Sequence, residues 1–196
     1  MPIKWRRVVI FFISLLPLSF LIFKVITQSL GADPAKEIVL FLGTWAFYFL
    51  LMTLSITPLK KIAKQNSVMT HRRMFGLFTL FYALLHLLSY LIFILGLNFS
   101  QFGAELIKRP YILLTLPAIV LLIILGITST KSMMRKLGKK WVKLHKSIYV
   151  ISILAWLHVL LQVRSSYFDA AFFGVITLSL LSLRLYWFYQ KKHPRP

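Results

Sequence analysis

Six apolar segments divide this chain, and each is close to the ~20 residues that a helix needs to cross the hydrocarbon core of a bilayer. They span residues 8–26, 38–57, 74–97, 111–128, 147–163 and 170–188. Pro58, Lys60 and Lys61 are expected to end the second segment. The pattern predicts an all-α integral membrane protein, a six-helix bundle that forms a single domain over residues 1–196. The first segment is expected to stay as an anchor, because no small-residue cleavage site follows it.

The composition supports a protein embedded in the lipid bilayer. A soluble domain is about half apolar and a quarter charged, whereas this chain is 59% hydrophobic and 14% charged, with a mean hydropathy of +0.79. The absence of cysteine excludes disulfides, iron–sulfur clusters and thiol chemistry. The formal charge of +20 does not indicate nucleic-acid binding, because the basic residues lie in the turns between apolar segments.

The basic residues also predict the orientation of the chain. Most of them fall before the first segment, in the loops at 58–73 and 129–146, and in the C-terminal tail. The loops on the other side hold only Lys24, Lys36, Lys108, Arg109 and Arg164. Since Lys and Arg collect on the cytoplasmic side, both termini are expected in the cytoplasm. No Gly-rich phosphate loop or attached soluble domain is expected.

Two histidines lie deep within these segments, at matched depth. His86 is 13 residues beyond Arg73, and His158 is 12 residues beyond Lys146. At 1.5 Å per residue, both lie roughly 18–20 Å from the cytoplasmic edge. Two neutral imidazoles on different helices at one depth are what an axial pair on one haem iron requires. The plain alternative is that each imidazole only bonds a backbone carbonyl or a serine such as Ser89 or Ser152.

A basic patch lies below His86 on the third segment. Arg72 falls about 40° from His86 on a helical wheel, and His71 about 60° away. Tyr82 and Tyr90 share the face of His86. An arginine at this position could hold haem propionates or a flavin phosphate, because it offers a planar fork of donors.

His145 is a less clear candidate ligand. It lies 13 residues before His158, or roughly 20 Å along a helix, which would suit a second redox centre nearer the cytoplasm. On an ideal wheel the two are about 140° apart. His71 is a conceivable partner at the same depth, although interfacial histidines among lysines are most often simply solvated.

Several segments together resemble one family. They are GTWAFYFLLMTLSITPLKK (43–61), HRRMFGLFTLFYALLHLLSY (71–90), KRPYILL (108–114) and GITSTKSMMRKLGKKWVKLHKSIYVISILAWLH (126–158). In order and spacing they are similar to the MsrQ (YedZ) family, the haem-binding membrane subunit of the bacterial periplasmic methionine sulfoxide reductase system. The wider relatives are the ferric reductase and NADPH oxidase membrane domains, which hold haem between the third and fifth helices.

This resemblance implies a b-type haem cytochrome with one or two haems, which also uses FMN and lies in the bacterial inner membrane. It implies a non-catalytic electron-transfer subunit, with electrons from the quinone pool or a cytosolic flavin reductase and with the periplasmic molybdopterin enzyme MsrP as acceptor. The haem histidines of the family fall on His86, His145 and His158, and its arginine pair on Arg72 and Arg73. Whether His145 ligates a second haem or lines a flavin site stays open.

Two other functions compete with this hypothesis. A cofactor-free transporter or structural membrane partner would need broken helices with polar clusters at the midplane, and no such cluster accompanies Pro17 or Pro117. Asp33, Glu37, Glu105 and Asp169 fall in loops or at their edges, which does not suit a proton relay. A self-sufficient ferric reductase is the third possibility. The far-side loops around 36–37 and 101–109 are candidates for docking a partner.

Overall fold

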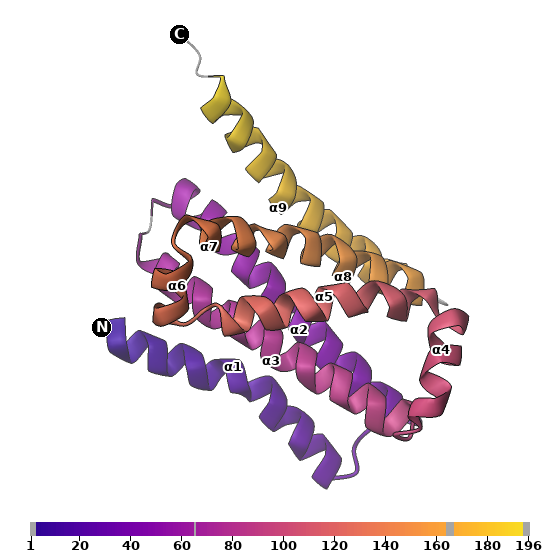
Figure 1. Cartoon of the computed structure of the whole chain (residues 1–196). Helices are drawn as coiled ribbons and strands as arrows, with labels where there is room; N and C mark the ends of the chain where they lie inside the picture. The colour runs from indigo at the N-terminus through magenta and orange to yellow at the C-terminus, as the bar shows by residue number, and fades with distance from the viewer. Residues whose placement is uncertain (1–2, 65, 164–166, 194–196) are drawn as a thin grey trace.

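The computed structural model of the protein describes residues 3–64, 66–163 and 167–193 (Figure 1). Within these residues the chain is helical and contains no strand. Six helices are long and apolar enough to cross a membrane: Trp5–Ile26, Pro34–Ile62, Val68–Ile94, Pro110–Ile127, Lys139–Gln162 and Phe168–Lys192. The predicted fold class, an all-α membrane bundle with six spanning helices, is therefore confirmed.

The spanning segments are built from helices of different regularity. The regular helices are α1 (Ile3–Ile26), α2 (Pro34–Ile62), α3 (Arg72–Ser89), α4 (Phe102–Lys108), α5 (Pro110–Ile127), α6 (Lys131–Leu137), α7 (Lys139–Leu144), α8 (Ile148–Gln162) and α9 (Phe168–Lys192). Short 3₁₀ turns are η1 (Asn66–His71), η3 (Phe99–Gln101) and η4 (His145–Ser147). A single π-helical turn, η2 (Tyr90–Ile94), continues α3. Two stretches expected as loops are thus helical in part, since α4 covers most of 101–109 and α6 and α7 cover much of 129–146.

The second helix is the centre of the bundle. It packs along α3 and also contacts α1 and α9, while α5 packs along α8. Leu50 and Leu54 of α2 join α5 and α8 in one buried cluster, and Phe49 joins α1 and α3 in a second. Phe47 and Leu51 form a third cluster with Phe173 of α9. Because α2 is apolar on every face over this length, neighbouring helices cover it from several sides.

Contrary to expectation, α2 does not end at Pro58. It continues to Ile62 with Pro58 inside it. A proline removes the hydrogen bond to the carbonyl four residues earlier, which here is the carbonyl of Leu54. The guanidinium of Arg184 on α9 donates to that oxygen instead. A side chain from a neighbouring helix thus replaces the missing donor, as is required inside a bilayer.

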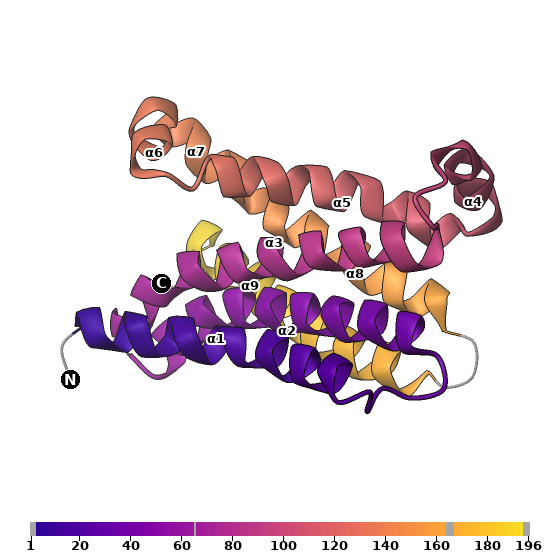
Figure 2. The same cartoon turned by 90° about the horizontal axis from the view of Figure 1, so that it is seen from below.

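The two ends of the bundle differ in charge. In both views α1 begins and α9 ends on the side where α6 and α7 lie, opposite α4 (Figures 1 and 2). We call this side the basic end, because it carries Arg6, Arg7, Arg72, Arg73 and the lysines of α6 and α7. The other side, where α4 lies, is called the opposite end.

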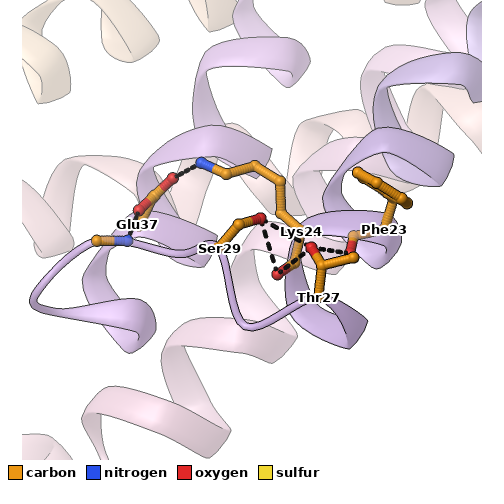
Figure 3. A network of polar contacts seen from close by, with 6 residues as sticks. Phe23, Lys24, Thr27, Ser29 and Glu37 are labelled. Atoms are coloured by element: carbon orange, nitrogen blue, oxygen red, sulfur yellow. Dashed lines mark hydrogen bonds and ion pairs between the residues drawn. The ribbon is translucent and has the colours of Figure 1, made fainter.

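An ion pair fastens α1 to α2 at the opposite end. Lys24 at the end of α1 contacts the carboxylate of Glu37 in the first turn of α2, and the same carboxylate accepts from the backbone N–H of Gly31 at 2.6 Å (Figure 3). Asp33 caps α2 by accepting from the N–H of Lys36 at 3.0 Å. These bonds fix the start of α2, which carries two residues of the site described next.

Candidate functional site

His86 of α3 and His158 of α8 face each other in the bundle. Their ring centroids are 6.2 Å apart, and the ring planes are inclined at 79°. Both residues are half-buried. The two histidines that were singled out by their matched depth are therefore brought together from separate helices.

Each imidazole is held by one backbone carbonyl. Nδ1 of His86 lies 2.8 Å from the carbonyl oxygen of Val39 at the start of α2, and Nδ1 of His158 lies 2.9 Å from that of Tyr111 at the start of α5. A carbonyl oxygen can only accept, so Nδ1 carries the proton in both rings and Nε2 keeps its lone pair. This arrangement orients a histidine for metal ligation through Nε2.

A glycine makes room for the first imidazole. A Cβ atom built on Gly43 of α2 would lie 2.9 Å from Nδ1 and 3.0 Å from Cε1 of His86. Any other residue at position 43 would push the ring away from the carbonyl of Val39, one turn earlier on the same helix. Gly43 was part of the family-like segment, but the sequence alone did not connect it with His86.

The chemistry of the pair fits a haem. Both rings keep the Nε2 lone pair, their centres are 6.2 Å apart, and these two donors would hold the iron of a haem. Along the described chain, α3 and α8 do not pack closely against each other: α3 packs on α2 and α5, and α8 on α5 and α9. A flat cofactor between two helices requires this kind of separation. Together these observations show that the donor set suits a haem.

The pair lies nearer the opposite end than the basic end. His86 is eight residues before the end of the π-helical turn, and His158 is four residues before the end of α8. From Arg72, at the basic end, the distance to His86 along α3 is about 21 Å. The imidazole pair is thus displaced away from the basic end of the bundle.

The two tyrosines on the face of His86 have different surroundings. The hydroxyl of Tyr82 donates to the carbonyl of Ser14 at 2.8 Å, which ties α3 to α1. The hydroxyl of Tyr90 is buried without a hydrogen-bond partner among the described residues. Tyr90 also opens the π-helical turn, an irregularity often found beside functional sites.

A second group of candidate residues lies at the basic end. His145 stacks on Trp141, with ring centroids 4.0 Å apart, and its Nε2 lies 3.1 Å from the hydroxyl of Thr128. Its electrostatic neighbour is Arg72, at the start of α3. Arg73 is exposed and Arg72 is half-buried. The structure therefore places His145 beside Trp141 and Thr128 at the basic end, in electrostatic range of Arg72 and away from the pair of His86 and His158.

The other basic candidates have separate positions. His71 is buried, its Nδ1 has no hydrogen-bond partner among the described residues, and its charged neighbours are Arg6 and Arg7. No ring contact joins it to His145 in the part of the chain that the structure describes. Arg164 lies outside the described residues. Within the described ranges, no group of three or more His, Cys, Asp or Glu side chains gathers around one point.

The fold and the imidazole pair define a class of polytopic membrane proteins with two histidines brought together between their helices. Over residues 42–156 the sequence matches the family described as ferric reductase like transmembrane component, and the chain belongs to this family. The match includes His86, His145, Arg72 and Arg73, ends just before His158, and leaves out α1 and α9. No solved structure matches the chain. Membership of this family supports a role in electron transfer within a membrane.

Proposed function

We propose that the protein is a b-type haem electron-transfer subunit of the bacterial inner membrane, with His86 and His158 as the axial ligands of one haem. The observation that carries this proposal is the pair of imidazoles, 6.2 Å apart, with both Nδ1 atoms bonded to backbone carbonyls. Haem, when bound, supplies a centre that accepts and releases one electron. Membership of the ferric reductase-like family supports the same chemistry.

The chain's own residues prepare this site. The carbonyls of Val39 and Tyr111 hold the two imidazoles in one tautomer and one orientation. Gly43 lets the ring of His86 approach α2 closely. Because an electron does not cross ~30 Å of hydrocarbon unaided, a centre inside the bundle divides the distance between the two membrane faces.

We further propose that FMN binds at the basic end, near Arg72, Arg73 and His145. Two observations support this assignment: the stacked rings of Trp141 and His145 offer a flat aromatic surface, and the half-buried Arg72 lies in electrostatic range of it. Since His145 already bonds Thr128 and its charged neighbour is an arginine, the flavin role for His145 is favoured over ligation of a second haem. The proposed flavin and haem together bridge the membrane from the basic end to the opposite end.

The proposed electron donor is the quinone pool or a cytosolic flavin reductase, and the proposed acceptor is the periplasmic molybdopterin enzyme MsrP. The resemblance of segments 43–61, 71–90, 108–114 and 126–158 to the MsrQ family supports this choice. The role would be repair of oxidised methionine in periplasmic proteins. In this orientation the basic end faces the cytoplasm, as the positive-inside rule requires.

Reconstitution of the purified protein in liposomes tests the proposed function. The haem is reduced with a quinol, or with a flavin reductase and NADPH, and its absorbance is followed after addition of MsrP with methionine sulfoxide. Reoxidation that needs both additions supports the proposal. If the haem stays reduced with MsrP but is reoxidised at once by a ferric chelate, the protein is a ferric reductase instead.

A further inference from the structure

Arg184 is a charged side chain about two turns inside a membrane-spanning helix. It lies eight residues before the end of α9, about 12 Å along the helix axis. An ionisable group at such depth is costly and is usually paired or functional. α9 also lies outside the region matched by the family, so neither the match nor the motifs account for this residue.

Part of the guanidinium has a structural role. One terminal nitrogen donates to the carbonyl of Leu54 that Pro58 leaves without its helical partner, and the other donates to the hydroxyl of Tyr149 at 2.5 Å. The guanidinium carbon lies 4.9 Å from the centre of the Tyr149 ring. Three of the five N–H donors of an arginine remain, and Nε is buried without a partner among the described residues.

A second guanidinium shares this location. Arg72 at the start of α3 is half-buried. It lies one turn before Gly76, where an added Cβ would be 3.8 Å from Thr53, the neighbour of Leu54, and it is in electrostatic range of Arg184. No hydrogen bond or ion pair joins Arg72 to another described side chain. The four acidic residues, Asp33, Glu37, Glu105 and Asp169, all lie at the opposite end of the bundle, near the start of α2, in α4 and near the start of α9. Two half-buried positive charges therefore lie in electrostatic range of each other, with no carboxylate beside them among the described residues, and an anion would stabilise this arrangement.

We propose that Arg184 and Arg72 together bind a phosphomonoester at the basic end of the bundle. A phosphomonoester carries about −1.5 to −2 charges at neutral pH and presents three acceptor oxygens, which matches two guanidinium groups with free donors. Tyr149 holds Arg184 in place through its hydroxyl and its ring. A haem held by His86 and His158 is too distant to supply the anion, because Arg72 lies about 21 Å from His86 along α3.

The phosphate has two possible sources with the same chemistry: a soluble mononucleotide such as FMN, or a lipid such as phosphatidic acid. The FMN source rests on the proposed function, whereas the phosphate site itself does not. Arg184 would then be a phosphate-binding residue contributed by the last helix, in addition to the arginines at the start of α3.

The test uses the full chain in neutral-lipid nanodiscs, with quenching of flavin fluorescence as the readout. FMN and riboflavin are titrated into the wild type, Arg184→Gln, Arg72→Gln and the control Arg135→Gln, which removes an exposed charge of α6 at the same end. We expect FMN to bind the wild type and the control more tightly than riboflavin does. Each of the other two variants should bind FMN about tenfold or more weakly, as a lost charge-assisted hydrogen bond predicts, with riboflavin unchanged.

A lipid arm identifies the source. If phosphatidic acid in the nanodisc weakens FMN binding to the wild type, or is retained by the wild type but not by Arg184→Gln, the site takes a phosphomonoester from either source. Equal binding of FMN and riboflavin to every protein, together with equal retention of phosphatidic acid, overturns the proposal.

Two further readouts separate a failed site from a failed fold or a failed haem assignment. In the background of Pro58→Ala, the N–H of residue 58 serves the carbonyl of Leu54, so Arg184→Gln no longer leaves this carbonyl without a donor. In the Pro58→Ala background, Arg184→Gln must still weaken FMN binding. The haem spectrum is recorded on the same samples. If the protein contains no haem but its FMN binding still depends on Arg184, the phosphate site is supported and the proposed function is rejected.

Discussion

His86 lies against Gly43 so closely that a methyl group at position 43 would be 2.9 Å from its Nδ1. The ring bonds the carbonyl of Val39 on the same helix, so its position depends on the missing side chain. Gly43→Ala should displace the imidazole and weaken haem retention at least several-fold, because overpacking costs about 1–3 kcal/mol. The measurement is the haem-to-protein ratio after purification.

Gly76→Ala is the matched control for this prediction. Gly76 lies on α3, like His86, but a Cβ there would meet only Thr53 Cγ2 at 3.8 Å, an ordinary contact. This variant should keep the haem content of the wild type. Full haem retention in Gly43→Ala, with an unchanged spectrum, would show that the close approach does not hold the ligand.

A second close approach joins α8 to α9. A Cβ on Gly174 would lie 2.5 Å from Nε1 of Trp156, which donates to the carbonyl of Ala170 at 2.9 Å. Gly174→Ala should therefore break this bond and lower the melting temperature in detergent, although alanine favours the helix by up to about 1 kcal/mol. Gly103→Ala, where nothing lies within 4 Å of the added atom, should leave the melting temperature unchanged or slightly raised.

Pro58 and Arg184 should be energetically coupled. Arg184→Met leaves the carbonyl of Leu54 without a donor, and an unsatisfied buried group costs about 1–3 kcal/mol. In a chain that also carries Pro58→Ala, the helix supplies the donor and the cost should shrink. A double-mutant cycle on the free energy of unfolding should give a coupling of about 0.5–2 kcal/mol. Strictly additive effects would mean that the bond between Arg184 and Leu54 does not contribute to stability.

His145 should not be needed for the haem signal. Its Nε2 bonds Thr128, and its ring stacks on Trp141. His145→Ala should retain the haem spectrum and one haem per chain, while FMN binding weakens. A loss of half of the haem from a wild type that holds two haems per chain would instead assign His145 to a second haem.

Much of the fold could be predicted from hydrophobic length alone. Six segments of about 20 apolar residues separated by basic turns leave few alternatives to a six-helix bundle. The end of α2 could not be predicted in this way. A proline leaves the carbonyl four residues earlier without its helical donor, which favours the end of the helix at Pro58. Arg184, distant in sequence, donates to this carbonyl instead. The partnership depends on packing between α2 and α9.

The two histidines of the candidate site could be predicted from the sequence, but the backbone carbonyls that hold them could not. Depth counting pairs His86 with His158, and the structure places the centres of their rings 6.2 Å apart, with the ring planes nearly perpendicular. The carbonyls of Val39 and Tyr111 carry no signal in the sequence, because any residue has a carbonyl. Arg184 was visible only as a charge near the basic end of the last helix, and its two acceptors lie on α2 and α8.

The most direct test of the haem assignment is the reduced-minus-oxidised visible spectrum of the purified protein, measured beside His86→Ala and His158→Ala. The proposed axial pair predicts a b-type spectrum with one haem per chain that is lost in both variants. A wild type without haem absorbance after expression with ample haem would contradict it, as would a spectrum that survives both substitutions.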